Sequence, residues 1–215
     1  MNIRSGCAGG EPMGRSGRFE GFDPADVRDL IAEFPLAWVC APCGDTETAS
    51  LLPLLGEFSD AGELTHLFGH MSRGNPLCER LGKDPEVLIL FQGPQAYISP
   101  THAGRRDWAP TWNYAQLRIA ARVTFLPDET PLALLSLVSA MEGGLDHPWD
   151  VAELGDRYVP MQGAIIAFRA EVTVLSGKFK LGQDEEVETL QNIFETLPDQ
   201  ATVRWMRRFN AKRLA

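Results

Sequence analysis

The stretch QLRIAARVTF, residues 116–125, alternates between apolar and mostly polar side chains. One side carries Leu117, Ile119, Ala121, Val123 and Phe125, and the other carries Gln116, Arg118, Ala120, Arg122 and Thr124. A period of two is typical of a β-strand with one buried face. The pattern returns in AIIAFRAEVTVLSGKFKLG, residues 164–182. The sequence therefore predicts two long strands, each with one face in a core.

Shorter β-rich runs lie upstream of these two strands. They are PLAWVCA (35–41), ETASLLPLL (47–55), ELTHLFGH (63–70), EVLILFQG (86–93) and AYISP (96–100). Gly93 and Pro94 separate the last two runs, so we expect a bend or a β-bulge there. Six or more strands with few helices between them favour an antiparallel barrel over a parallel sheet.

Helical patterns flank the strands. An apolar stripe with Asp23 and Pro24 at its start predicts a helix to about Phe34. Further helices are expected at 73–82, 130–141, 184–197 and 199–210. The Gly-rich residues 1–18 lack apolar periodicity and are expected to be a disordered tail. Residues 19–215 are expected to form one domain, a barrel with C-terminal helices.

Composition narrows the function classes. The 215 residues include 20 Lys and Arg against 29 Asp and Glu, a net charge of −9. This balance argues against a broad nucleic-acid interface, which needs a basic face. No apolar run reaches the roughly 18 residues of a transmembrane helix, and the first residues do not read as a signal peptide. Four cysteines are too few for a disulfide framework and fit the cytoplasm.

The motif CAPC, from Cys40 to Cys43, has the spacing of a redox or half-zinc motif. No second Cys-x-x-Cys follows, and no helical pattern begins at Cys40 as a thioredoxin-like site requires. We therefore interpret it as the end of a strand running into a proline-containing turn.

The segment YISPTHAGRRDWAPTWNY, residues 97–114, concentrates aromatic and cationic side chains in one connection. Its prolines favour extended backbone at Ser99 and Ala109, which predicts a loop rather than a helix between them. Such a loop can hold a flat or anionic ligand. The alternative is a loop that packs on its own aromatic rings.

Four further segments follow one another along the chain: GHMSRGNP (69–76), VLILFQGPQAYISP (87–100), APTWNY (109–114) and KFKLGQ (178–183). In this order they resemble the PaiB-type family of FMN-binding negative transcriptional regulators, and the resemblance covers about residues 20–210. It implies a flavin-reductase-like split barrel of six strands. It also implies a homodimer that binds a planar cofactor near the interface between subunits.

The sequence departs from the family pattern at two places. Where the family usually has SPSWY, this chain has SPTHA, so that His102 and Ala103 replace an aromatic pair. Where the family usually has KLSQNR, it has KLGQDE, which adds carboxylates at a place where a flavin phosphate prefers hydroxyls, amides and cations. Heme needs instead an axial ligand, an apolar slot and cations for its propionates.

Some relatives of this family are heme-dependent piperazate synthases, which this chain resembles in keeping the framework and changing the phosphate end. The expected function is accordingly heme-b-dependent formation of the N–N bond of piperazic acid from side-chain N-hydroxylated ornithine. The alternative is an FMN-binding regulator of the PaiB type. The sequence assigns no residue to proton transfer.

Candidate cofactor residues follow from these motifs. His70 is the candidate axial ligand, against a structural histidine bonded to its loop, and His102 is the alternative ligand. Arg73 and Lys180 could bind an anionic group of the cofactor, although either could be a solvated surface cation. Trp112 and Tyr114 could wall the pocket or pack in the barrel core. His66 and His147 are expected to be structural or exposed.

Overall fold

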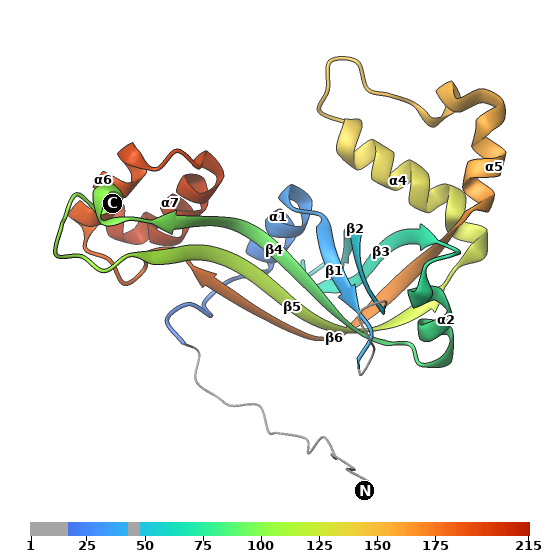
Figure 1. The fold of residues 1–215 in the computed structure, drawn as a ribbon, viewed down its shortest axis with the longest axis horizontal. Helices are drawn as coiled ribbons and strands as arrows, with labels where there is room; N and C mark the ends of the chain where they lie inside the picture. The colour runs from blue at the N-terminus through green and yellow to red at the C-terminus, as the bar shows by residue number, and fades with distance from the viewer. Residues whose placement is uncertain (1–16, 43–47) are drawn as a thin grey trace, which may run out of the picture.

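The computed structural model describes residues 17–42 and 48–215. Six antiparallel strands close into a barrel in the order β1-β2-β3-β6-β5-β4 (Figure 1). The strands are β1 (Leu36–Cys40), β2 (Ala49–Phe58), β3 (Leu64–Ser72), β4 (Glu86–Ile98), β5 (Thr111–Phe125) and β6 (Ile165–Lys180). The predicted fold class, an antiparallel barrel with helices, is confirmed.

In β5, buried and exposed side chains alternate in the same way as the apolar and polar residues of the sequence. Leu117, Ile119 and Ala121 are fully buried in the barrel, whereas Arg118 and Arg122 face outward. The two runs predicted as separate strands at 86–93 and 96–100 are one strand, β4, because a bulge keeps them in the same ladder. The register with β5 shifts between Gln92 and Gln95, which confirms the predicted bulge at Gly93-Pro94.

Helix α1 (Pro24–Glu33) packs its apolar side against the barrel. Asp23 caps it, accepting a bond from the backbone N–H of Asp26 while the Asp26 carboxylate accepts one in return. Leu30 is fully buried and lies so near Gly93 that a Cβ there would stand 3.0 Å from its Cδ1 atom. A glycine at the β4 bulge therefore lets α1 approach the barrel. The predicted short helix near residue 76 is α2 (Pro76–Lys83).

The ends of β4, β5 and β6 extend past the barrel and form, with two helices, a region that we call the wing. Its strand residues are 92–98, 111–118 and 174–180, which pair with one another beyond the reach of β1 and β3. Helices α6 (Val187–Thr196) and α7 (Gln200–Leu214) cover one face of these strands (Figure 1). Phe179 is buried there and stacks on Phe209 with ring centroids 4.8 Å apart.

A second projection, the arm, comprises residues 130–163 and rises from the opposite end of the barrel (Figure 1). It contains α4 (Thr130–Glu142), the 3-10 helix η3 (Val151–Arg157) and α5 (Tyr158–Gly163), and the short 3-10 turn η2 (Pro127–Glu129) leads into it. The sequence predicted α4, but it did not predict η3 or α5. Only Thr130 and Ala133 of α4 are buried.

Three further expectations concern the N-terminal tail, the CAPC motif and transmembrane helices. Residues 1–16 of the expected tail and Cys43 of the CAPC motif lie outside the described residues. Cys40 ends β1, as the strand-end interpretation requires. Within the described ranges, no helix has the length and apolar character needed to cross a membrane.

Candidate functional site

The structure separates the predicted site residues into two groups. His70 lies on β3 and Arg73 directly follows it, at the foot of the arm. Trp112, Tyr114 and Lys180 lie together on the wing, where Tyr114 pairs with Lys180. His70 pairs with Ala167 of β6, and thirteen strand residues from there to Lys180 span roughly 40 Å. One cofactor can therefore touch both groups only between two copies of the chain.

His70 points away from the barrel interior. Its neighbours Gly69 and Met71 are buried on the interior side, so that His70 shares the outer face of β3 with Phe68. Phe68 packs on Ala133 of α4, which places His70 beside the foot of that helix. The Nδ1 atom of His70 is buried and has no hydrogen-bond partner among the described residues.

Burial also sets the charge of His70. Desolvation lowers the pKa of its imidazole below the ordinary value of 6.5, so that the neutral form prevails near pH 7. A neutral imidazole with an open nitrogen is the form that binds iron. A metal-ligating histidine usually donates a hydrogen bond from the N–H of its second ring nitrogen, and Nδ1 of His70 has no acceptor within the described ranges. The residue fits an axial ligand, although without a partner to fix its tautomer.

Arg73 holds the end of the arm against β3. Its backbone N–H donates to the carbonyl oxygen of Ala164 at 2.9 Å, and its Nε donates to that of Gly163 at 3.2 Å. Among the residues described, its two terminal nitrogens have no hydrogen-bond partner. The guanidinium can therefore keep its structural bond and still reach an anionic group at the foot of the arm.

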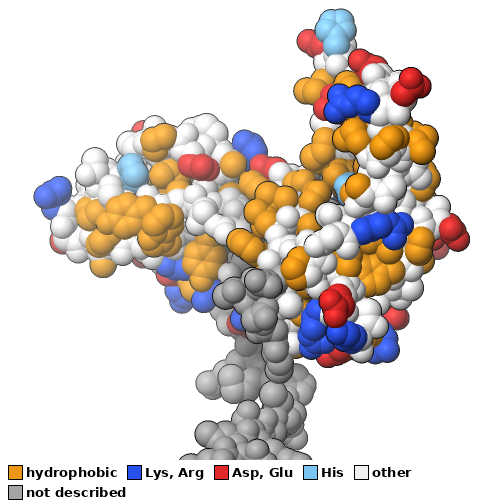
Figure 2. All heavy atoms as spheres, turned by 45° about the vertical axis from the view of Figure 1, so that its right-hand side comes forward, with side chains coloured by type: hydrophobic (Ala, Val, Ile, Leu, Met, Phe, Trp, Pro, Cys, Tyr) orange, Lys and Arg blue, Asp and Glu red, His pale blue; other side chains and the backbone are white. Residues whose placement is uncertain are grey.

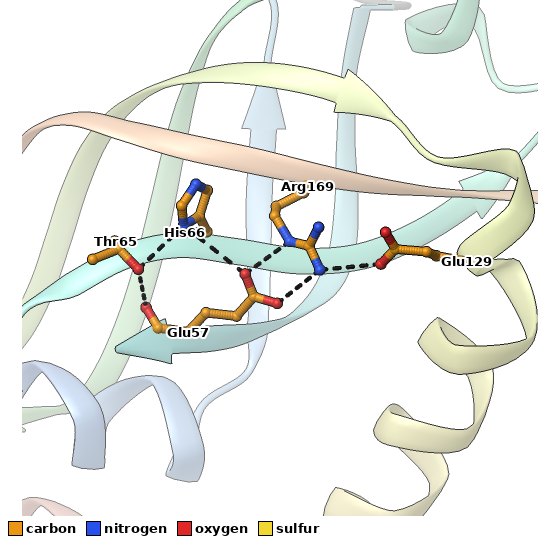
Figure 3. A network of polar contacts seen from close by, with 5 residues as sticks. All are labelled: Glu57, Thr65, His66, Glu129 and Arg169. Atoms are coloured by element: carbon orange, nitrogen blue, oxygen red, sulfur yellow. Dashed lines mark hydrogen bonds and ion pairs between the residues drawn. The ribbon is translucent and has the colours of Figure 1, made fainter. Parts of the chain in front are cut away.

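A polar network fixes the other end of the arm, and the sequence did not reveal it (Figure 3). Arg169 of β6 donates to both oxygens of Glu57, with the shorter bond at 2.8 Å, and to Glu129 at 3.1 Å. His66 extends the network, with Nδ1 4.0 Å from a Glu57 oxygen. In the sequence Arg169 is only one more outward residue of an alternating strand, so no local signal marks it.

The outer face of the wing, opposite α6 and α7, is aromatic and cationic. Tyr97 and Trp112 are exposed and lie with ring centroids 5.8 Å apart. Lys178 lies 5.9 Å from the ring centroid of Tyr114, and the ammonium group of Lys180 donates to the Thr111 hydroxyl. A hollow of about 410 Å³ continues from Tyr114 onto the barrel. This face suits a planar anion.

The loop predicted between Ser99 and Ala109 contains a one-turn helix, α3 (Pro100–Ala103). His102 belongs to its cap, because its Nδ1 accepts a bond from the Ser99 backbone N–H at 3.3 Å. An accepting Nδ1 places the proton of the neutral ring on Nε2, which then has no lone pair for a metal. Ligation by His102 would require this cap to break, so the geometry favours His70.

The segment KLGQDE is occupied by bonds within the chain. The Gln183 side chain accepts from the Leu181 N–H at 2.7 Å and donates to the Phe179 carbonyl at 2.6 Å. Glu185 accepts from the Trp108 indole at 2.8 Å, so the aromatic loop also packs on this segment. Gly182 has a φ of 85°, which explains why a glycine suits this position. These groups support the wing rather than face a ligand.

The closed six-stranded antiparallel barrel with its flanking helices is the fold of the flavin-binding split-barrel proteins. The family model described as "Putative FMN-binding domain" matches residues 13–174, more than half of the chain. The chain belongs to this family. "Protease synthase and sporulation protein PAI 2" of Bacillus subtilis (strain 168) is 29% identical over 171 residues, which cover 78% of this chain and 77% of that protein. The PaiB-type resemblance is thus confirmed.

Solved structures share the fold at low identity. The flavocytochrome Anf3 from Azotobacter vinelandii is 14% identical with a TM-score of 0.56, over 74% of this chain and 68% of that chain. The FAD and heme binding protein from Mycobacterium smegmatis is 16% identical with a TM-score of 0.54, over 80% and 77%. At these identities the likeness establishes the architecture.

Proposed function

We propose that this chain is a heme-dependent enzyme, similar to piperazate synthases, with His70 as the axial ligand of heme b. The observation that carries the proposal is the imidazole of His70, whose pKa is lowered by desolvation and whose buried Nδ1 has no hydrogen-bond partner among the described residues. It lies at the foot of a helix whose apolar side chains are mostly uncovered. Heme iron commonly takes a histidine as its axial ligand, and the porphyrin prefers apolar surroundings. Arg73, three residues further, can pair with a propionate through its terminal nitrogens.

The proposed reaction closes a ring in side-chain N-hydroxylated ornithine. The α-amine attacks the hydroxylated nitrogen, the N–N bond forms as the N–O bond breaks, and one water leaves. When bound, heme iron would supply the Lewis acid that polarises the N–O bond. The chain itself would hold the iron through His70, anchor the cofactor through Arg73 and exclude water with the apolar side of the arm.

The phosphate end of the family pattern supports heme over flavin. Gln183 and Glu185 bond to groups of the chain, and Asp184 adds a negative charge beside them. A flavin phosphate would meet carboxylates there and would have to displace internal hydrogen bonds. A heme carries no phosphate and avoids this conflict.

A second candidate is an FMN-binding regulator of the PaiB type, as the family match suggests. The aromatic and cationic outer face of the wing favours it, because Trp112 and Tyr114 could stack on a flavin while Lys180 pairs with its phosphate. In this case the cofactor would lie on the wing and His70 would have a structural role.

We also propose a cytoplasmic homodimer of a 19–215 domain preceded by a disordered tail, with an amino acid as substrate and neither DNA nor a membrane as partner. The dimer is supported by large apolar side chains left exposed on the barrel and arm, among them Leu36, Trp38 and Leu132. The free thiols of Cys40 and Cys78 agree with a reducing compartment.

The test is to load the protein with heme or with FMN and to incubate each form with side-chain N-hydroxylated ornithine. We expect only the heme-loaded form to give a cyclic product lighter by one water, measured by mass spectrometry. His70→Ala should abolish product, whereas His147→Ala, a change in an exposed histidine of the arm, should not. Stoichiometric FMN binding without any turnover of the heme form would overturn the enzyme and favour the regulator.

A further inference from the structure

Helix α4 of the arm has an apolar surface that the chain itself leaves uncovered. Apolar residues lie on all sides of the helix, yet Leu132 is 50% exposed and Leu135 is 46% exposed. Met141 is 44% exposed, and Val159 and Met161 of α5 are also exposed. A helix that is apolar on all sides is normally buried. Something outside the described residues of this chain is therefore expected to cover the arm.

The barrel of the same chain is poorly placed to cover it, because both ends of the arm are fixed. At the start, the Thr130 hydroxyl accepts a bond from the Ala167 N–H at 3.2 Å, and Arg169 joins Glu129 to Glu57 (Figure 3). At the end, Arg73 bonds to the carbonyls of Gly163 and Ala164. Closing the arm onto its own barrel would break these contacts.

The tip of the arm is acidic. Residues 142–157 contain five carboxylates and one arginine, a formal charge of −4. Asp146 and Asp156 are exposed, and neither side chain has an ion pair among the residues described. Figure 2 shows acidic side chains at the end of the arm, with apolar side chains along it below them. A partner for this surface should therefore offer both apolar area and positive charge.

The outer face of the wing has both properties. It exposes the rings of Tyr97 and Trp112 and carries three cations, Arg118, Lys178 and Lys180. The wing strand residues 92–98, 111–118 and 174–180 contain no Asp or Glu. Helices α6 and α7 cover the opposite face of the same strands, so the outer face is the one that no helix of the described residues covers.

We propose that the arm of one copy docks on the outer face of the wing of a second copy. The acidic tip would lie against Arg118, Lys178 and Lys180, and apolar residues of the arm would cover Tyr97 and Trp112. In a twofold dimer each copy supplies one arm and one wing, so the contact is made twice. Charge complementarity favours a second copy over an unrelated partner. The proposal rests on the homodimer stated above and defines its interface.

Charge reversal tests the docking. Chain X carries Arg118→Glu and Lys178→Glu on the wing, and chain Y carries Asp146→Lys and Asp156→Lys on the arm. X has two acidic surfaces and Y has two basic ones, so the dissociation constant of each homodimer should rise at least about tenfold, and each should dissociate at a correspondingly higher protein concentration than the unmodified chain. The X–Y pair is complementary at both contacts, so mixing the two should restore a dimer in sedimentation velocity.

Lys83→Glu with Lys212→Glu is the matched control, since it changes the net charge as X does but at exposed positions on α2 and α7. It should remain dimeric. At a dilution where every chain is monomeric, the melting temperature of X and Y should match that of the unmodified chain. If X and Y both remain dimers of wild-type affinity, the docking is wrong and the homodimer forms through another face. If X and Y fail to associate when mixed, the docking is also wrong. If the unmodified chain is a monomer at micromolar concentration, the homodimer itself fails, and the docking with it.

Discussion

The arm and the wing are both helical additions to one barrel, but they are built in opposite ways. The wing helices pack their apolar residues against the strands, since Trp205 and Phe209 of α7 stack on Phe179 of β6 and on each other. The arm buries only the first turn of α4 and is held by polar contacts at its two ends. The difference indicates that the wing helices stabilise the single chain, whereas the arm offers its surface to something else.

Two leucines test this contrast with the largest effect. Leu190 of α6 is fully buried and Leu135 of α4 is 46% exposed. Leu190→Ala should lower the free energy of unfolding by about 2–5 kcal/mol, because it opens a cavity. Leu135→Ala should change it by less than about 0.5 kcal/mol in the single chain. Urea denaturation at several protein concentrations separates the single chain from any dimer, and equal losses at both positions would refute the contrast.

Arg169 gives the next largest effect. Arg169→Gln should cost about 1 kcal/mol, because the Arg169 network is partly shielded from water and joins three elements. It should also speed amide hydrogen exchange in α4 without affecting α6. Arg122→Gln is the control, since Arg122 forms a single exposed ion pair with Glu86. If exchange in α4 is unchanged, the Arg169 network does not hold the arm.

A smaller effect concerns pH and His70. Its folded pKa is lowered by desolvation, so on acidification the unfolded chain binds a proton near pH 6.5 before the folded chain does. The contribution of His70 to the free energy of unfolding is therefore complete above pH 6.5, and it is lost as the pH falls through the pKa of His70 in the folded chain. In cofactor-free protein, His70→Leu should remove this part of the pH dependence. Parallel pH curves for the two proteins would show that His70 is not desolvated.

The smallest effect is expected for the tail. Deleting residues 1–18 should leave the melting temperature unchanged, because their sequence has no apolar periodicity from which a helix or strand could pack on the barrel. Phe19 must be kept, since its carbonyl accepts a bond from the Phe179 N–H at 2.8 Å. A melting temperature that falls by several degrees would show that the tail contributes to the fold.

The barrel was predictable because its signals are local. The alternation in β5 and β6, the proline after Gly93 and the cap at Asp23 each act over a few residues. The pairing of β3 with β6, and the position of the arm, depend on contacts between distant residues such as Arg169 and Glu57. The helix expected from Asp184 begins at Val187, because Gln183 holds the preceding turn.

The candidate site was only partly predictable for the same reason. Motifs identified His70, Arg73, Trp112, Tyr114 and Lys180 as individual residues. They could not show that most of the length of β6 separates His70 and Arg73 from the three residues on the wing. Nor could they show that His102 is engaged in a helix cap, which depends on the backbone of Ser99.

The central claim is that His70 binds heme. The most direct measurement is the absorption spectrum of the purified protein, loaded with heme, beside His70→Ala and His102→Ala. The account predicts a Soret band in the unmodified protein and in His102→Ala, and its loss or displacement in His70→Ala while the melting temperature stays close to wild type. An unaltered Soret band in His70→Ala, or its loss only in His102→Ala, would contradict the account.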